Sequence, residues 1–205
     1  MVYQALRERI IWGAYGPGYR IVVDVIADEL GVSATPVREA MRRLEAERLI
    51  SYRPNVGAQV AVGDPRRLAE EVDVIAVLDG AVTALAAPWI DDPEVARLTE
   101  INHDMAEAIA GLDLQRLRRR DHDFHRLIHG ICPNGALVAA LHRLDLARRL
   151  SLTQITGVWI AAVAEHRILI QLLAGHVQAA IIEEVARQHT FNTLTGMRRD
   201  RGWVS

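Results

Sequence analysis

The 205-residue sequence contains one cysteine, Cys132, and no lysine, so all 24 basic residues are arginines. A single cysteine excludes an internal disulfide framework and a cysteine-based zinc site. No run of 18 uncharged apolar residues occurs, which argues against a membrane-spanning helix and a membrane partner. The charged, helix-periodic start of the chain does not have the pattern of a secretory signal, so we expect a cytoplasmic protein.

The charge balance is nearly even along the chain. Residues 1–62 contain eight arginines and seven acidic residues, a net charge of +1, and the remainder contains 16 arginines and 19 acidic residues, a net charge of −3. Charge alone therefore does not identify a nucleic-acid-binding protein. Half of the residues are hydrophobic, which is typical of a soluble globular chain. A turn cluster at Gly63-Asp64-Pro65 separates two predicted domains, over residues 1–62 and 66–200.

The first stretch has the pattern of three short helices. Apolar residues recur at helical spacing over residues 2–12. Asp24 is the expected N-cap of a second helix, which Gly31 ends. Ser33 or Thr35 is the expected N-cap of a third helix, which has a proline in its first turn.

The third predicted helix has one apolar face and one arginine-bearing face. Its apolar residues fall at positions i, i+3, i+4 and i+7, and are Val37, Ala40, Met41 and Leu44. Arg38 and Arg42 are four residues apart and project together from the other face. β-rich runs at 50–53 and 58–62 flank a turn and predict a hairpin. The arginines alone would equally fit a solvated face, but the ordered set of elements predicts a winged helix-turn-helix that reads DNA.

A family resemblance is carried by residues 31–40, Gly-Val-Ser-Ala-Thr-Pro-Val-Arg-Glu-Ala, and 43–47, Arg-Leu-Glu-Ala-Glu. These residues resemble the signature of GntR transcription regulators, and the resemblance covers residues 1–62. It implies DNA contacts from Ser33, Thr35 and Arg38 and from the wing turn between Asn55 and Gly57.

Two residues depart from the family pattern. Ala34 stands where the family usually has arginine, so one base or phosphate contact is missing. Arg48 stands where the family usually has glycine before the wing, and arginine tolerates a positive φ poorly. The sequence therefore predicts a changed operator preference and a strained turn.

The second stretch has only helical periodicity. The predicted helices span residues 65–89, 93–111, 113–131, 135–155, 158–175 and 176–197. Several of them are broadly apolar, which suits helices buried on more than one side. The predicted fold class is mainly α, with an N-terminal winged helix-turn-helix of three helices and a β-hairpin followed by an all-α, six-helix antiparallel bundle.

Histidines with metal-ligand spacing occur in this bundle. Asp121 and His125 are four residues apart and therefore share one helix face, where a carboxylate and an imidazole can bind one metal ion. His166 and His189 lie on two later helices. A lone histidine on an apolar helix is more often only hydrogen-bonded, so the spacing leaves both readings open.

A second resemblance extends over most of residues 66–195. Asp-x-x-Phe-His at 121–125, Glu-His-Arg at 165–167 and Arg-x-His at 187–189 look like the FCD ligand-binding domain of this regulator family. The resemblance implies that Asp121, His125, His166 and His189 bind a divalent metal ion. Zinc is the default because imidazole and carboxylate ligands suit it, although nickel, iron, cobalt and manganese accept the same set. The other histidines are assigned no ligand role.

Together these patterns predict a DNA-binding transcription regulator rather than an enzyme. A small organic acid, bound near the metal and paired with an arginine such as Arg148 or Arg149, is expected to control operator affinity. A homodimer is expected because a twofold dimer reads a palindromic operator in double-stranded DNA.

Two alternatives keep part of this scheme. In the first, the metal is purely structural and the regulator has no small-molecule effector. In the second, the bundle is a metalloenzyme that activates water on the ion, with Glu165 beside His166 as the candidate base.

Overall fold

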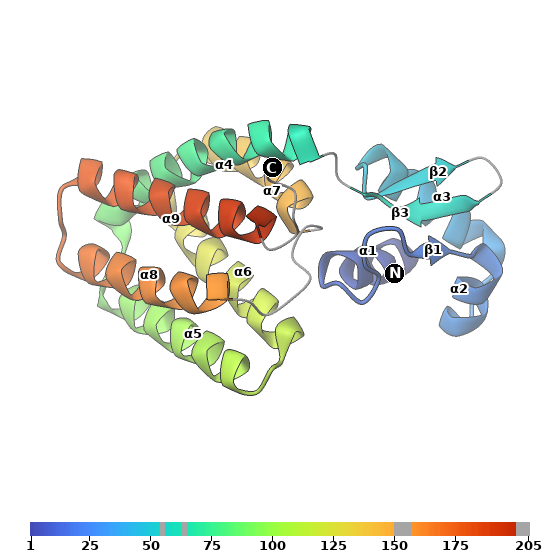
Figure 1. The fold of residues 1–205 in the computed structure, drawn as a ribbon, viewed down its shortest axis with the longest axis horizontal. Coiled ribbons are helices and arrows are strands. Elements are labelled where there is room, and N and C mark those ends of the chain that lie inside the picture. The colour runs from blue at the N-terminus through green and yellow to red at the C-terminus, as the bar shows by residue number, and fades with distance from the viewer. Residues whose placement is uncertain (54–55, 63–64, 150–156, 200–205) are drawn as a thin grey trace. The chain divides into compact units, whose positions relative to one another are not determined.

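Helices account for most of the computed structural model, which describes residues 1–53, 56–62, 65–149 and 157–199. The chain forms two units, one over Met1–Asp64 and a second that begins at Pro65 (Figure 1). The first unit contains α1 (Val2–Ile11), β1 (Arg20–Ile21), α2 (Val23–Leu30), α3 (Ala34–Ala46), β2 (Ile50–Arg53) and β3 (Gly57–Val60). The three predicted helices and the predicted hairpin are therefore confirmed.

The sheet has one strand more than the sequence predicted. β1 pairs antiparallel with β3, opposite β2, so the strand order is β1-β3-β2. Ser51 faces Gln59 across the hairpin, and Ile21 faces Ala58 on the other side of β3. A two-residue strand is too short to show an alternating pattern, which is why residue spacing did not reveal it.

The helix ends follow the predictions with one correction. Gly31 ends α2 in the left-handed region at φ 63°, and Ser33 is the N-cap residue of α3. The prediction that Asp24 is the N-cap of α2 was wrong, because Val22 holds that position and Asp24 lies in the first turn. The short strand β1 ends at Ile21, so the chain enters the helix before Asp24. From the first turn of α2, the negative Asp24 carboxylate still interacts favourably with the positive N-terminal end of the helix dipole.

Helix α3 is held against the rest of its unit by its predicted apolar stripe. Val37, Met41 and Leu44 are almost fully buried. The last turn is tied to α1 by Glu47, which accepts a hydrogen bond from the Tyr3 hydroxyl and pairs with Arg7 at 3.3 Å. These contacts hold the opposite face of α3 toward solvent.

Arg48 has a backbone conformation in the left-handed region, as expected for a position where the family usually has glycine. Its φ is 59°, in the turn between α3 and β2. The turn is closed by backbone hydrogen bonds from Arg48 to Glu45 and from Leu49 to Leu44, at 2.8 and 2.9 Å. A residue with a Cβ is strained in this conformation, so the departure from the family pattern costs some stability.

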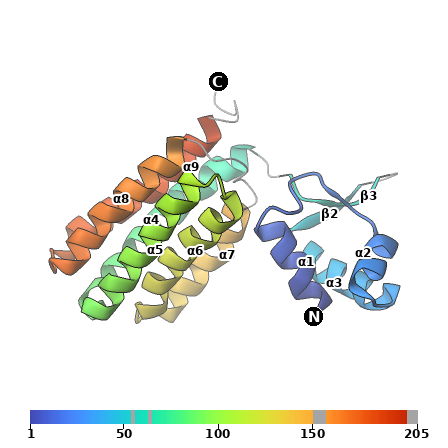
Figure 2. The ribbon, with the colours of Figure 1, turned by 90° about the horizontal axis from the view of Figure 1, so that it is seen from below.

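The second unit is the predicted six-helix bundle. Its helices are α4 (Pro65–Ala86), α5 (Asp92–Ala110), α6 (Leu114–Ile131), α7 (Gly135–Arg149), α8 (Gly157–Ala174) and α9 (Ala179–Arg199). Figure 2 shows their axes running alongside one another. A short 3-10 turn, η1 (Ala87–Trp89), ends α4 and was not predicted separately. Residues 150–155, predicted to continue the fourth bundle helix, lie outside the described residues.

Helices α4 and α9 approach each other closely at Gly80. A Cβ added to Gly80 would lie 2.7 Å from the Glu183 carbonyl oxygen and 3.0 Å from the Arg187 Cβ. The glycine is thus required by a backbone contact between helices rather than by a turn. This contact places the residue before it, Asp79, beside α9.

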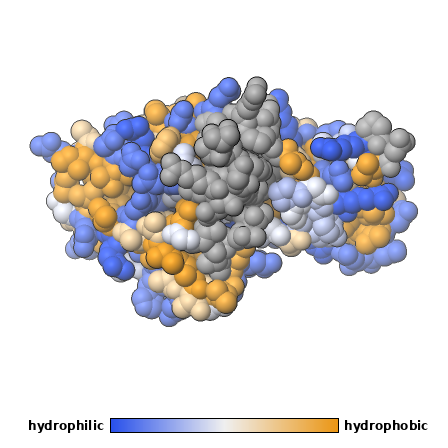
Figure 3. Space-filling view, viewed as in Figure 1, coloured by the Kyte–Doolittle hydropathy of each residue, from blue (hydrophilic) through white to orange (hydrophobic). Residues whose placement is uncertain are grey.

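Two segments of the bundle have the length and hydropathy of a membrane span. They cover Glu70–Trp89 and Gly157–Ala174, of which 56% and 39% are buried inside the structure. A buried core helix passes the same test of length and composition. Figure 3 shows hydrophobic residues gathered in patches among hydrophilic ones on the visible face of this unit.

Candidate functional site

Helix α6 presents the first two predicted metal ligands on its buried face. Asp113 begins the helix by accepting a hydrogen bond from the Arg116 backbone N–H at 2.9 Å. The residues that turn inward are Leu117, Arg118, Asp121, Phe124, His125, Ile128 and His129. Their spacing of three and four residues is that of one helix face. Asp121 and His125 therefore both point into the bundle, with Asp121 Oδ1 at 3.7 Å from His125 Nε2.

His166 and His189 meet His125 in the interior. His166 on α8 is fully buried, and His189 on α9 is 2% exposed. Their Nε2 atoms are 3.0 Å apart. The ring of Phe124 stacks on His166 with 3.9 Å between ring centres and fixes the plane of that imidazole.

The three imidazoles can share one cation. One nitrogen of each ring lies within 4.8 Å of the others, and all three residues are buried. Asp121 adjoins this group through its contact with His125. The structure thus brings together three of the four predicted ligands directly and places the fourth beside them. Three neutral imidazoles and a carboxylate form a set that zinc and related divalent ions accept.

A carboxylate lies behind one of these rings. Glu165 Oε2 is 2.8 Å from His189 Nδ1, and Asn192 Nδ2 donates to Glu165 Oε1 at 2.9 Å. Burial raises the pKa of Glu165, but the hydrogen bonds from His189 and Asn192 outweigh it, and the net shift is downward. The carboxylate is therefore ionised at neutral pH and acts as an acceptor.

A second group of ligand atoms was missed by sequence reasoning. Asp79 on α4, His125 and His129 also place one ligand atom each within 4.8 Å of one another. Asp79 Oδ1 is 2.7 Å from His129 Nε2, and the Thr190 hydroxyl donates to Asp79 Oδ2 at 2.7 Å. The signal that could have found Asp79 is an aspartate inside an otherwise apolar helix, since a buried carboxylate needs partners.

The remaining histidines differ in their surroundings. His129, which was assigned no ligand role, belongs to this second group and also lies 3.1 Å from His142. His103 and His176 are exposed. His176 has a φ of 47° and closes α8 in the position where a glycine usually stands.

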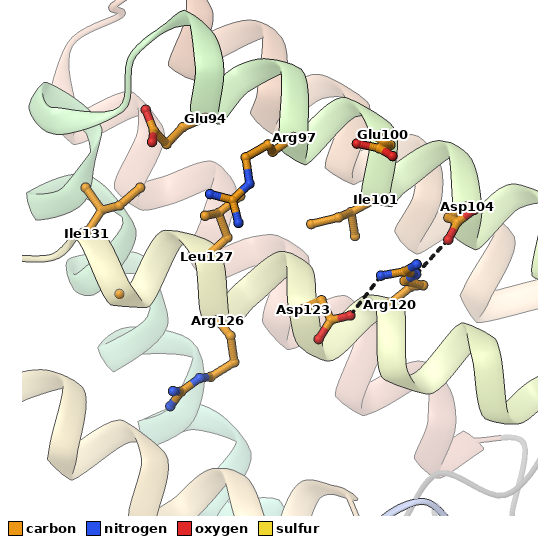
Figure 4. A pocket seen from close by; sticks show the side chains of 11 residues that line it. Glu94, Arg97, Glu100, Ile101, Asp104, Arg120, Asp123, Arg126, Leu127 and Ile131 are labelled. Atoms are coloured by element: carbon orange, nitrogen blue, oxygen red, sulfur yellow. Dashed lines mark hydrogen bonds and ion pairs between the residues drawn. The ribbon is translucent and has the colours of Figure 1, made fainter.

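A cavity of about 660 Å³ lies between α5 and α6, and none of its lining residues is a histidine (Figure 4). Charged side chains of both signs line it around Ile101, Leu127 and Ile131. Arg120 pairs with Asp104 at 2.6 Å and with Asp123 at 3.2 Å, as the dashed lines show. Arg120 is thus already paired with two carboxylates, and Arg97 and Arg126 also line the cavity.

The first unit exposes its predicted DNA-reading residues. Ser33, the N-cap residue of α3, is exposed, and so are Thr35, Arg38 and Arg42 within the helix. Gly57 begins β3 with a φ of 89° and is exposed. Asn55, the other predicted wing residue, lies outside the described residues. The side chains of Arg148 and Arg149, named as candidates for pairing an effector, also lie outside them, whereas Arg118 is a buried arginine that sequence reasoning missed.

Known proteins match both units of the chain. The family of bacterial regulatory proteins called gntR matches residues 1–60, and the FCD domain matches residues 70–191. A transcriptional regulator of the helix-turn-helix type from the TAR-I ttuE-ttuC' intergenic region of Agrobacterium vitis is 34% identical over 130 residues, which cover 62% of this chain and 75% of the relative. A similar regulator from an unstable DNA locus of Streptomyces ambofaciens is 30% identical over 172 residues, covering 81% of this chain and 71% of the relative.

Solved structures share the fold. The E. coli protein McbR/YncC superposes with a TM-score of 0.84 at 20% identity, covering 98% of this chain and 96% of that one. A GntR regulator from Rhodococcus superposes with a TM-score of 0.73 at 24% identity and the same coverage. These relatives are transcription regulators and not enzymes. The chain therefore belongs to the GntR family of bacterial DNA-binding transcription regulators, with an FCD domain following its winged helix.

Proposed function

We propose that operator binding by this regulator is controlled by a small organic acid bound near a divalent metal ion in the helical unit. The observation that carries the proposal is the meeting of His125, His166 and His189, from three helices, within 4.8 Å of one another in the bundle interior. In this scheme a DNA-binding domain over residues 1–62 finds the operator, an effector domain over residues 66–200 senses the acid, and both act in the cytoplasm without a membrane partner.

The DNA contacts come from α3 and the wing. Ser33, Thr35, Arg38 and Arg42 face solvent on one helix whose other face is buried, and we add Asn55 and Gly57 from the wing turn. Arginine can bond guanine O6 and N7 with two parallel hydrogen bonds or clamp a phosphate. Arg38 is one turn nearer the N-terminus of α3 than Arg42, the part of a recognition helix that reaches base edges.

The Arg38→Ala variant is expected to weaken operator binding by about 1–3 kcal/mol if Arg38 reads a base. Fluorescence anisotropy of the full chain on a duplex selected from random sequences measures this loss. Arg97→Ala, on α5 of the other unit, is the matched control and leaves the affinity unchanged. A footprint that Arg38→Ala does not alter would remove this residue from the interface.

Zinc is the proposed ion, held by His125, His166, His189 and Asp121. When bound as a five- or six-coordinate ion, it would supply a positive charge to which an effector carboxylate could bind. Arg118 supports the site for an acid, since this buried arginine lies on the same face of α6 one turn before Asp121. We propose that Arg118 pairs the carboxylate of the effector, because a guanidinium binds carboxylates with good geometry.

A homodimer is the proposed DNA-bound form. Exposed apolar residues on the helical unit support self-association, including Val74 and Val77 on α4 and Ile160 and Ile168 on α8, which are 49%, 53%, 62% and 50% exposed. Exposed apolar patches mark interaction surfaces, and a twofold dimer matches a palindromic operator. Light scattering of the full chain at micromolar concentration tests this, and a monomer in the presence of operator DNA would refute it.

Effector control is tested by measuring operator affinity with and without carboxylates. The effector must bind one arrangement of the two winged domains better than the other, since otherwise it shifts no equilibrium. For zinc-loaded protein, at least one member of a panel of mono-, di- and tricarboxylates is expected to change the dissociation constant about 5- to 150-fold. Zinc-free protein should show no such change.

The structural-metal alternative predicts a different outcome. Under that alternative, no carboxylate alters operator affinity, while removal of zinc by a chelator causes cooperative unfolding. Observing both results would refute effector control and leave the zinc site in place. The metalloenzyme alternative has no support from the relatives, which are transcription regulators.

A further inference from the structure

The two ring nitrogens of His189 lie in different surroundings. Nε2 faces the histidine group and is 3.0 Å from His166 Nε2. Nδ1 faces the other way and is 2.8 Å from Glu165 Oε2. The ring is 2% exposed, so neither nitrogen has ready access to bulk water and its protein partners decide where the proton lies.

Glu165 is itself held in place on both oxygens. Oε2 contacts His189, and Oε1 accepts a hydrogen bond from Asn192 Nδ2 at 2.9 Å. Asn192 follows His189 by three residues on α9, so both donors come from one face of that helix. The carboxylate thus bridges α8 and α9 immediately behind the imidazole.

The contact between Glu165 and His189 determines which tautomer the imidazole of His189 adopts. A carboxylate oxygen 2.8 Å from a ring nitrogen accepts the hydrogen bond of its N–H, so we assign the proton to His189 Nδ1. In a neutral imidazole the lone pair is then on Nε2, the atom that lies 3.0 Å from His166 Nε2. A metal ligand needs this form, and histidine ligands commonly donate their other N–H to a carboxylate.

We propose that Glu165 is a positioning residue for the candidate metal centre, which through His189 Nδ1 fixes the tautomer and orientation of the ring so that Nε2 is presented as a ligand. This inference rests on the proposed metal function. It differs from a role as a general base on the ion, because both oxygens of Glu165 are engaged by α9.

Zinc affinity of the full-length protein provides the first test. Glu165→Ala is expected to weaken zinc binding about 10- to 100-fold, the usual effect of removing such a partner, as measured by competition with a chelator. Glu165→Gln keeps the shape and one acceptor oxygen but loses the charge, so it should restore only part of the affinity, whereas a purely steric role predicts full recovery. Glu184→Ala removes an exposed glutamate of α9 that pairs with Arg187 at 2.7 Å, away from His189, and is the matched control.

The tautomer of His189 provides a second test that needs no metal. Long-range ¹H–¹⁵N spectra of zinc-free protein should show the Nδ1–H form in the wild type and a shift toward a mixture in Glu165→Ala. If the wild type binds no zinc, the metal function fails while this spectrum still decides the inference. An Nε2–H ring in the wild type, or a Glu165→Ala variant that folds and binds zinc as tightly as the wild type, would overturn it.

Discussion

His166→Ala is expected to lower the zinc affinity at least about 100-fold. Removing a residue that only hydrogen-bonds to a metal ligand costs about 10- to 100-fold in affinity, and removing a direct ligand costs more. At a free zinc concentration about 1,000 times the wild-type dissociation constant, zinc stabilises the wild type by about 4 kcal/mol, and a 100-fold loss leaves about 1.4 kcal/mol. Urea unfolding with and without zinc measures this increment, and elemental analysis measures bound zinc per chain.

The increment isolates metal binding from packing. His166 is fully buried and stacks on Phe124 at 3.9 Å, so its truncation also destabilises the zinc-free protein. That loss is common to both measurements and cancels in the difference. His103→Ala is the matched control, because the His103 side chain is 74% exposed. An unchanged stabilisation by zinc in His166→Ala would show that the histidine group is not the site.

Gly80→Leu is expected to destabilise the helical unit by about 3 kcal/mol, the upper part of the range for overpacking a core. The reason is the 2.7 Å distance between an added Cβ and the Glu183 carbonyl oxygen, which is a backbone atom that cannot rotate away. Helices α4 and α9 would have to move apart, which would also separate Asp79 on α4 from Thr190 on α9. Urea unfolding followed by circular dichroism measures the loss.

Gly130→Leu is the matched control for this substitution. Gly130 lies in α6, and a Cβ added there meets no atom within 4 Å. The helix propensity of leucine is more favourable than that of glycine by nearly 1 kcal/mol, so this variant should be at least as stable as the wild type. Equal stability of Gly80→Leu and Gly130→Leu would refute the close contact between α4 and α9.

Local pattern was sufficient for much of the fold. The apolar stripe at Val37, Met41 and Leu44 predicted which face of α3 is buried, and thereby that Arg38 and Arg42 are exposed. Spacing alone also placed Asp121 and His125 on one helix face. Such features depend on residues within one helix, whose geometry is fixed by a repeat of 3.6 residues.

Features that depend on pairing between distant segments were beyond such reasoning. Strand β1 exists because β3 offers it hydrogen-bond partners, and Val22 rather than Asp24 begins α2 because β1 ends where it does. Asp79 has no neighbour in sequence that marks it, since its contacts are with His129 and Thr190 on other helices. Spacing within one helix carries no information on contacts of that kind.

The sequence by itself determined the two kinds of unit and the exposed face of α3 with its arginines, and its resemblance to the FCD domain supplied the candidate ligands Asp121, His125, His166 and His189. Only the tertiary structure decided that the three imidazoles lie within reach of one another, that Glu165 contacts His189 Nδ1, and that Gly80 allows α4 to pack closely against α9. The physical reason is that a helix repeat fixes which side chains share a face, whereas the packing of one helix on another fixes which faces meet.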